Sequence, residues 1–587
     1  MINTPDKPAF LNVAASATGR RWIGPSVEED RLSEAMTQAT GLPAPLCRTL
    51  VRRGIGAEDA TTFLAPTLRD LLPDPHAMRD MEKAAARFLH AVATREKIAI
   101  FADYDVDGGT SAALIITWLR DMGLPSTLYI PDRIDEGYGP NDEAMEMLAR
   151  DHDLIICVDC GTLSHGPIAA AKGADVVVLD HHLGGETLPG ALAVVNPNRQ
   201  DESGDLGHLC AAGVVFLMLV ESNRQLRAKG EKGPDMMAML DLVALATVAD
   251  VAPLIGVNRA FVRQGLTVMA RRQRIGLTAL ADVAGLDATP TSYHLGFLLG
   301  PRVNAGGRIG KADLGARLLA TIDRHEATAL AARLDQLNTE RREVEAQVRD
   351  LAFEQATERG LDGPLVWAAG EGWHPGVVGI VAARLKEATN RPAVVIGLDG
   401  PEGKGSGRSV SGIDLGAAIQ RTAAEGLLIK GGGHKMAAGL TVARDQLDAA
   451  MQRLGDLLAK QGAGDIGPAD LRLDGILMPG AATVELIDQI ENAGPFGAGA
   501  PAPRFAFPDC QILFAKQVGA NHLKISFGDG LGARIDAISF GAMDGPLGPM
   551  LMGHNGARFH LAGRLEINIW QGRQSVQLRL EDAAPAH

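Results

Sequence analysis

The sequence has few cysteines, few aromatic residues and no long apolar run, and each shortage excludes a class of protein. No stretch reaches the ~20 consecutive apolar residues that a transmembrane helix requires. Five cysteines in 587 residues are too few for a disulfide framework. Residues 1–16 lack the basic and apolar segments of a secretory signal. We therefore expect a cytoplasmic protein without membrane association.

The composition is otherwise that of a globular protein, because 46% of the residues are hydrophobic and 22% are charged. The net charge of −14, taken alone, argues against a nucleic-acid partner. The charge is uneven, however. Residues 501–587 contain eight basic and seven acidic side chains, and residues 301–311 contain three basic and no acidic ones. Local basic patches therefore leave a nucleic-acid partner open.

Short apolar runs alternate with helical segments from residue 97 onward, which predicts an α/β domain with a parallel sheet. A long charged helix over 323–359 follows, and a helix this polar usually bridges domains. Short alternating strands after residue 500 are typical of a small barrel. The predicted units are an N-terminal lead-in (1–90), an α/β domain (91–322), a linking helix (323–360), a second α/β domain (361–465) and the barrel (466–587).

Acidic residues and histidines follow several predicted strands, and this is the most informative pattern. The carboxyl ends of parallel strands line one crevice. Many carboxylates there repel one another unless cations bind, and oxygen ligands with one or two imidazoles suit Mn²⁺ or Mg²⁺. Two such ions hydrolyse phosphate esters in many enzymes. The residues are Asp103, Asp105, Asp107, Asp159, Asp180, His181, His182 and Asp250.

Five motifs together resemble the DHH phosphoesterases. They are DYDVDG (103–108), VDCG (158–161), DHH (180–182), TVAD (247–250) and, in the second α/β unit, GGGHKMAAG (431–439). Further segments resemble the bacterial single-strand-specific 5′→3′ exonucleases of that superfamily. These are IPDRIDEGYG (130–139), GPRVNAGGRIG (300–310), WHPGVVGIVAARL (373–385), GKGSGRS (403–409) and PFGAGAPAPRF (495–505).

The resemblance implies an exonuclease that degrades single-stranded DNA from a 5′ end to mononucleotides in recombination and repair. It implies a DHH domain, a DHHA1 domain and an OB-fold-like barrel. Two Mn²⁺ or Mg²⁺ ions are implied as cofactors, with Asp159 bridging them and His182 near the scissile phosphate. A single-strand-binding protein or a helicase is implied as a further partner. The implied metal ligands are Asp103, Asp105, Asp107, Asp159, His181 and Asp250.

A 5′ exonuclease must also hold the terminal phosphate, and arginine pairs with phosphate through two parallel hydrogen bonds. Glycine-rich loops can offer backbone N–H groups to the same group. The candidate substrate-binding residues in the matched segments are Arg133, Arg302, Arg308, Ser406, Arg408, Gly432, Gly433 and His434. In the barrel, the candidate contacts to single strands are Lys524, Phe527, Phe540 and Trp570.

Other hypotheses remain. A nuclease of very short RNA or a cyclic-dinucleotide phosphodiesterase would share the two catalytic domains, but such relatives normally lack a barrel. An inactive single-strand-binding scaffold would have lost metal ligands, yet every proposed position holds Asp or His. Cys157 and Cys160 form a C-x-x-C pair that could indicate a redox or zinc site. No second cysteine pair accompanies them, which disfavours both.

Overall fold

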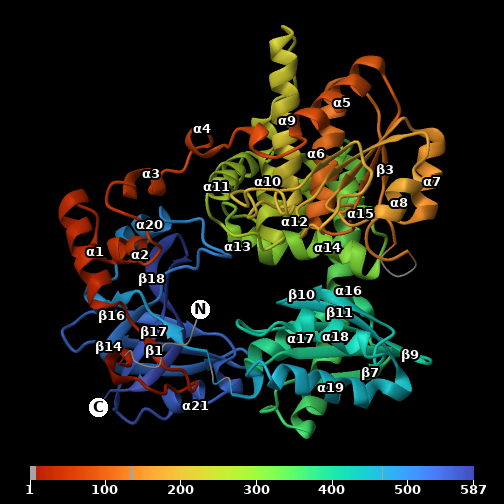
Figure 1. Cartoon of the computed structure of the whole chain (residues 1–587). Coiled ribbons are helices and arrows are strands. Elements are labelled where there is room, and N and C mark those ends of the chain that lie inside the picture. Colours follow the sequence, from red (N-terminus) through yellow and green to blue (C-terminus); the bar gives the residue numbers. More distant parts are fainter. Residues whose placement is uncertain (1–7, 133–135, 466, 468, 587) are drawn as a thin grey trace.

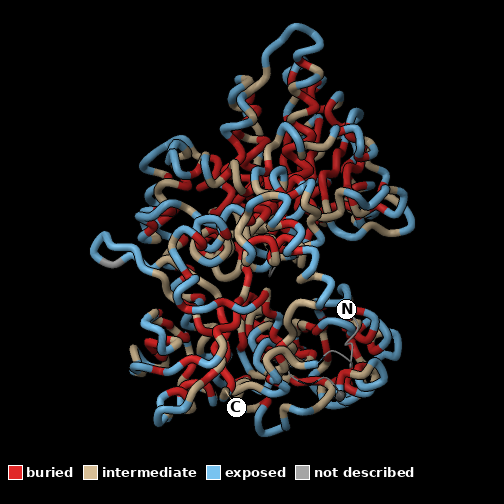
Figure 2. The backbone as a smooth tube through the Cα atoms, turned by 90° about the vertical axis from the view of Figure 1, so that its left-hand side faces the viewer, coloured by how far each residue is buried: buried red, intermediate tan, exposed pale blue. Residues whose placement is uncertain are grey.

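The computed structural model describes residues 8–132, 136–465, 467 and 469–586. Figure 1 shows the first α/β domain at the top, the second α/β domain at the lower right and the barrel at the lower left. Buried residues fill the interior of the upper and lower bodies (Figure 2). Within these ranges, no helix is both long enough and apolar enough to cross a membrane.

The first domain is built on a parallel sheet in the order β3-β2-β4-β5-β6. Successive side chains point to opposite faces, so Ile98 and Ile100 enter one hydrophobic cluster while Ala99 and Phe101 enter another. Both faces are therefore buried, as is usual for parallel sheets. The strands are β2 (Ile98–Ala102), β3 (Thr127–Tyr129), β4 (Leu154–Val158), β5 (Asp175–Leu179) and β6 (Ala193–Val195).

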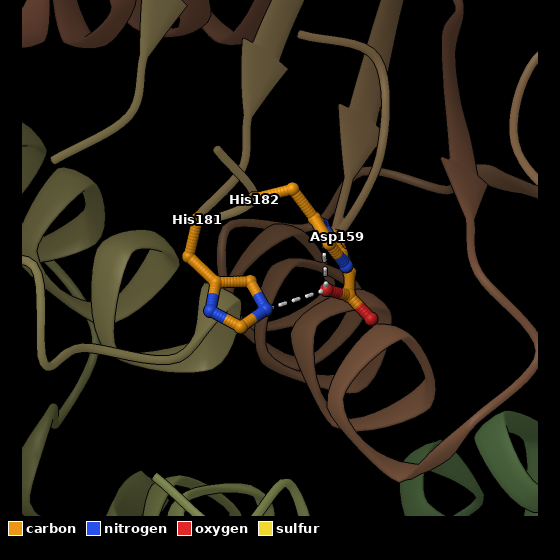
Figure 3. A group of neighbouring side chains, drawn as sticks. All are labelled: Asp159, His181 and His182. Carbon is orange, nitrogen blue, oxygen red and sulfur yellow. Dashed lines mark ion pairs between the residues drawn. The ribbon is translucent and has the colours of Figure 1, made fainter. Parts of the chain in front are cut away.

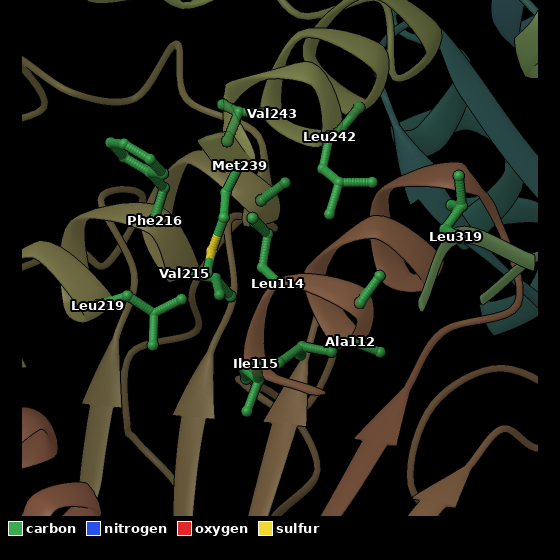
Figure 4. Close-up of a cluster of buried hydrophobic side chains, with 14 of the residues drawn as sticks. Ala112, Leu114, Ile115, Val215, Phe216, Leu219, Met239, Leu242, Val243 and Leu319 are labelled. Carbon is green, nitrogen blue, oxygen red and sulfur yellow. The ribbon is translucent and has the colours of Figure 1, made fainter. Parts of the chain in front are cut away.

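Helices cover both faces of this sheet. One face packs against α7 and α8, and the other packs against the larger cluster drawn in Figure 4, where α6 and α9 meet α10 and α15. The helices are α5 (Met81–Thr94), α6 (Val106–Asp121), α7 (Asp142–Asp151), α8 (His165–Ala170), α9 (Ala211–Ala228), α10 (Leu240–Ala249), α11 (Val257–Ala270), α12 (Ile275–Val283), α13 (Ser292–His294), α14 (Gly300–Ile309) and α15 (Leu314–Ala320).

The 36-residue helix α16 (Arg324–Arg359) leads to the second α/β domain. Its sheet has the order β10-β11-β9-β8-β7, with β7 and β8 parallel and the other pairs antiparallel. The elements are β7 (Val366–Glu371), α17 (Pro375–Thr389), β8 (Ala393–Asp399), β9 (Glu402–Arg408), α18 (Leu415–Ala424), β10 (Lys430–His434), β11 (Ala437–Ala443) and α19 (Leu447–Ala459).

The C-terminal sheet closes into a barrel, because β14 pairs with both β15 and β17 while β18 pairs with β16 and β17. The elements are β12 (Leu471–Arg472), β13 (Gly475–Ile476), α20 (Val484–Glu491), β14 (Phe505–Val518), β15 (His522–Gly528), β16 (Arg534–Ser539), α21 (Leu547–Met552), β17 (Arg558–Trp570) and β18 (Arg573–Pro585). The predicted fold class, two α/β domains, a linking helix and a barrel, is confirmed.

The N-terminal segment packs against both the barrel domain and the first α/β domain. Strand β1 (Trp22–Ile23) pairs with β12 of the barrel domain, and the buried indole of Trp22 donates to Asp582 Oδ2 at 3.0 Å. The predicted boundary at residue 90 falls inside α5, whose apolar face lies in the core of the first domain. The predicted boundary therefore divides a helix that packs in this core. The remaining helices are α1 (Val27–Thr40), α2 (Ala44–Val51), α3 (Ala60–Leu64) and α4 (Leu68–Leu71).

Candidate metal centre

The carboxyl ends of β2, β4 and β5 are neighbours in the sheet, so the loops after them meet at one edge. Asp103 follows β2, Asp159 follows β4 and His181 follows β5. Asp250 arrives from the C-terminus of α10. Asp159 has left-handed backbone (φ 60°), which is uncommon outside glycine and is concentrated at functional sites.

The DxDxD segment folds into the start of α6. Asp105 caps this helix by accepting hydrogen bonds from the backbone N–H groups of Asp107 and Gly108 at 2.8 and 3.2 Å. The buried Asp107 carboxylate accepts from the N–H groups of Ala211 and Ala212 at 2.7 and 2.8 Å. These two donors open α9, and the partial positive charge of a helix N-terminus stabilises an anion there.

His181 lies within an acidic cluster that consists of Asp103, Asp105, Asp107, Asp159 and Asp250. Its Nε2 atom is 3.3 Å from Asp159 Oδ1, 3.6 Å from Asp107 Oδ2 and 3.9 Å from Asp250 Oδ2. Figure 3 shows that His181 and His182 both approach the same oxygen of Asp159. These distances place one imidazole nitrogen among three carboxylates.

Three overlapping groups of side chains could each hold a cation. Asp159 and His181 each belong to two of them, which is the arrangement expected of ligands shared between neighbouring ions. The groups are Asp103–Asp105–Asp159, Asp107–His181–Asp250 and Asp159–His181–His182, and within each group the potential ligand atoms lie within 4.8 Å of one another. The structure thus brings together all six predicted metal ligands.

The electrostatics of the cluster fit divalent cations. Burial and the carboxylate of Asp107 raise the pKa of Asp159 well above its usual range. Burial and the same neighbour raise the pKa of Asp250 to about 9. Asp159 Oδ1 is buried yet accepts no hydrogen bond within the described ranges. A bound cation would compensate this buried oxygen for the missing hydrogen bond.

Asp180, the first residue of the DHH motif, positions its two histidines. Its Oδ1 atom accepts the backbone N–H groups of His181 and His182 and also His182 Nδ1 at 2.8 Å. Its Oδ2 atom accepts the N–H of Thr162. Although burial opposes it, the hydrogen bond from His182 lowers the pKa of Asp180, and the reciprocal contact raises the pKa of His182. His182 therefore carries charge more readily than a free histidine.

Sequence reasoning missed Tyr138. Its hydroxyl donates to the carbonyl oxygen of Asp159 at 3.1 Å and lies 3.2 Å from the ring nitrogens of His182. The sequence did point to Tyr138, because this residue belongs to the segment at 130–139 that resembles the exonuclease family. Arg133 of the same segment lies outside the described residues.

The arginines of segment 300–310 have different surroundings. Arg302 is 8% exposed, and its guanidinium donates to Asp335 of α16 at 2.8 Å and to the carbonyl of Leu298. Arg302 therefore packs between α14 and α16, and its contact with phosphate stays a prediction. Arg308 donates to the carbonyl of Gly376 at the start of α17 and lines a groove between the two α/β domains.

The remaining candidates lie on β9 and β10 of the second domain, the two strands that flank β11 in its sheet. On β9, Arg408 donates to the hydroxyl of Ser406 at 2.9 Å. On β10, Gly433 has a left-handed φ of 145°, and a Cβ there would lie 2.5 Å from the carbonyl oxygen of Ala437. A side chain at Gly432 would meet open space, and His434 is exposed. The five predicted residues thus lie on two strands of one sheet, and their contact with a terminal phosphate stays a prediction.

The cysteine pair of the first domain does not suit redox or zinc chemistry. Cys157 and Cys160 are both buried, and burial raises the pKa of Cys157 to about 12. A thiol with this pKa is a poor nucleophile and a poor zinc ligand.

In the barrel, Phe527 is fully buried in the core, which corrects its prediction as a DNA contact. Lys524 pairs with Asp536, and Phe540 is exposed.

We expect binding of Mn²⁺ to release protons. The raised pKa values mean that carboxyls such as Asp250 hold a proton near pH 7.5 without a cation, and a ligating carboxylate must lose it. Apparent metal affinity should therefore rise with pH up to about 9, the pKa of Asp250. Titration calorimetry in two buffers of different ionisation enthalpy measures the release. Equal heats in both buffers would contradict the expectation.

The same metal should stabilise the fold, by about 2.7 kcal/mol at a concentration of 100 Kd. A higher unfolding temperature in Mn²⁺ than in EDTA is the expected result. The Asp121→Asn variant is a matched control, because this exposed residue ends α6 far from its metal-binding start. It should keep the full shift, whereas Asp250→Asn should reduce both the shift and the proton release.

A parallel sheet with DxDxD and DHH segments at its carboxyl edge, followed by a second α/β domain, defines the DHH phosphoesterases. Residues 97–247 match the DHH family, N-terminal domain, residues 362–460 match the DHHA1 domain and residues 473–582 match the RecJ OB domain. The chain belongs to the RecJ family of single-stranded-DNA-specific exonucleases.

Individual relatives cover most of the chain. RecJ of Dickeya dadantii is 38% identical over 566 residues, which are 93% of this chain and 96% of the relative. RecJ of Bacillus subtilis is 34% identical over 583 residues, which are 97% of this chain and 71% of the relative. The crystal structure of Thermus thermophilus RecJ with Mn²⁺ superposes with a TM-score of 0.78 at 28% identity, covering 96% of this chain and 79% of that one. The same protein has been solved with Mg²⁺.

Proposed function

We propose that this protein is a metal-dependent exonuclease that degrades single-stranded DNA from its 5′ end to mononucleotides, in recombination and repair in the cytoplasm. The observation that carries the proposal is the sharing of Asp159 and His181 between neighbouring potential cation groups. The RecJ relatives solved with Mn²⁺ and Mg²⁺ support the choice of metal. The barrel supports a polymeric substrate over a dinucleotide, since single strands commonly bind such barrels.

The side chains divide the work of hydrolysis. Two bound divalent ions would supply positive charge at the scissile phosphate and activate water. The residues that would hold them are those of the acidic cluster and His181. His182 is held by Asp180 through Nδ1, and its Nε2 atom lies 3.2 Å from the Tyr138 hydroxyl; this imidazole would donate a proton or hydrogen bond to a phosphate oxygen. Tyr138 restrains the same ring.

The second domain would set the direction of attack. Arg408, Ser406 and the glycine-rich strand β10 offer guanidinium and backbone donors to a terminal phosphate. A 5′ phosphate bound there would fix which end of the strand enters the metal centre. The family resemblance supports a single-strand-binding protein or a helicase as a further partner in this process.

The test uses single-stranded DNA labelled at either end, a duplex and a cyclic dinucleotide, each with Mn²⁺. We expect immediate release of labelled mononucleotide from the 5′-labelled single strand, with delayed release from the 3′ label. Cleavage of the cyclic dinucleotide alone would overturn the proposal. Binding without cleavage would favour an inactive scaffold, and initial release from the 3′ end would refute the polarity.

A further inference from the structure

Exposed aromatic side chains gather at one cleft of this aromatic-poor protein. Among the described residues, five exposed Phe and Tyr side chains occur, namely Tyr138, Tyr293, Phe297, Phe514 and Phe540. Three of the five, Tyr293, Phe297 and Phe540, line a single cleft of about 620 Å³ between the first domain and the barrel. A single exposed aromatic needs no explanation, whereas such clustering marks a binding surface.

Tyr293 and Phe297 form the wall that belongs to the first domain. Their rings are stacked, with centroids 5.0 Å apart and planes 26° apart, and they are 56% and 66% exposed. They lie on α13 and on the π-helical turn η4 (Leu295–Leu299). The hydroxyl of Ser292 donates to the carbonyl of Phe496 at 2.9 Å, which fixes this turn against the segment leading to the barrel. In Figure 1, α13 lies at the lower side of the first domain, toward the barrel.

The opposite wall comes from the barrel. The guanidinium of Arg579 lies over the ring of Phe540, 5.3 Å from its centroid. Arg579 also pairs with Glu566 at 3.5 Å, and Arg564 pairs with Glu581 at 2.7 Å. With Arg20, the lining holds three guanidinium groups and one carboxylate. The cleft is therefore aromatic and moderately basic.

Phe297 connects this cleft to a second, strongly basic groove of about 470 Å³ between the two α/β domains. The groove has one acidic lining residue, Glu345, and five arginines: Arg308, Arg341, Arg342, Arg349 and Arg384. Its wall includes Asn304, whose Oδ1 accepts the N–H of Val106 at 3.0 Å. Val106 directly follows Asp105, so the groove adjoins the metal centre.

We propose that Tyr293 and Phe297 form a base-stacking platform for the undegraded part of a single strand, on its way from the arginine groove to the barrel. The inference rests on the proposed function and adds to it a binding site on the catalytic domain. A basic groove combined with aromatic faces is how proteins hold single strands without reading their sequence. The stacked pair, with Phe540 opposite, offers such faces, and the groove offers the cations.

The test compares Tyr293→Ala and Phe297→Ala with Phe514→Ala, a matched control on β14 that is 48% exposed and absent from the cleft lining. Each variant degrades a trinucleotide and a strand of about 20 nucleotides, longer than the ~4–16 that one barrel covers. We expect KM for the long strand to rise about 10-fold in the platform variants, the effect of losing one stacked base. Their trinucleotide activity, and both activities of the control, should be unchanged.

A direct readout of stacking is the fluorescence of 2-aminopurine placed at successive positions of the long strand, measured in EDTA to prevent cleavage. Quenching is expected at positions several nucleotides from the 5′ end and should weaken in Phe297→Ala. The platform is refuted if wild-type protein degrades the strand but the variants match it, or if they lose trinucleotide activity equally. Failure of the wild type to degrade single strands would instead refute the proposed function.

Discussion

The Asp159→Ala variant should lose at least about 10³-fold of its turnover on single-stranded DNA, because divalent ions contribute several kcal/mol of transition-state stabilisation. Asp159 belongs to two of the three potential cation groups, so its removal disturbs more than one ion. DNA affinity should fall much less, since the proposed phosphate and base contacts lie on other elements. Single-turnover rates and equilibrium binding to a labelled strand separate the two quantities.

The control for this variant is again Asp121→Asn, which removes a carboxylate from the exposed end of α6 and should leave turnover unchanged. Retention of more than a tenth of wild-type turnover in Asp159→Ala would contradict the metal assignment. Equal losses of affinity and turnover would show that the substitution had unfolded the site. The unfolding temperature in EDTA detects that outcome independently.

The Asp180→Asn variant should lower the free energy of unfolding by about 3 kcal/mol, which is the second large effect that we expect. The buried carboxylate accepts from four donors, which belong to Thr162, His181 and His182. An amide would turn its own N–H group toward at least one of them. Since the folded pKa of Asp180 is lowered, its stabilisation is complete above the unfolded value of about 3.9 and is lost as pH falls through the folded pKa.

Urea denaturation in EDTA at pH 7 measures this loss. The matched control is Asp175→Asn at the other end of β5, where an exposed carboxylate pairs with Arg87 at 2.6 Å. Surface pairs contribute about 0–1 kcal/mol, so this variant should remain near wild type. Comparable stability of the two variants would contradict the role of Asp180. A misoriented His182 should also lower turnover in Asp180→Asn more than it raises KM.

Much of the fold was predictable because it follows from local patterns. Buried parallel strands have near-continuous apolar sequences, and a strand end such as Asp103 or Asp159 marks the functional edge of the sheet. The helix predicted at 323–359 is observed at Arg324–Arg359. The proximity of Asp250 to this edge came from the family resemblance, because the packing of α10 is not visible in local periodicity.

Local sequence does not predict the surroundings of a side chain where tertiary contacts decide them. Arg302 and Arg308 lie six residues apart on α14, yet the first faces Asp335 and the second faces the interdomain groove. Phe527 and Phe540 are both strand-associated aromatics, but alternation within β15 turns the first inward. The cleft beside Tyr293 and Phe297 could not be predicted from the sequence, because its opposite wall is formed by the barrel.

The pairing of β1 with β12 has a consequence for biosynthesis. Trp22 finds its strand partner, Leu471, only after roughly 450 further residues have been made, which takes the ribosome about 20–90 s at typical elongation rates. The first domain, whose core cluster extends no further than Leu337, can fold during that interval. The amino-terminal strand must wait unpaired, with its indole exposed. For this segment the order of maturation is thus the reverse of the order of synthesis, because a strand that is made early is among the last to be paired.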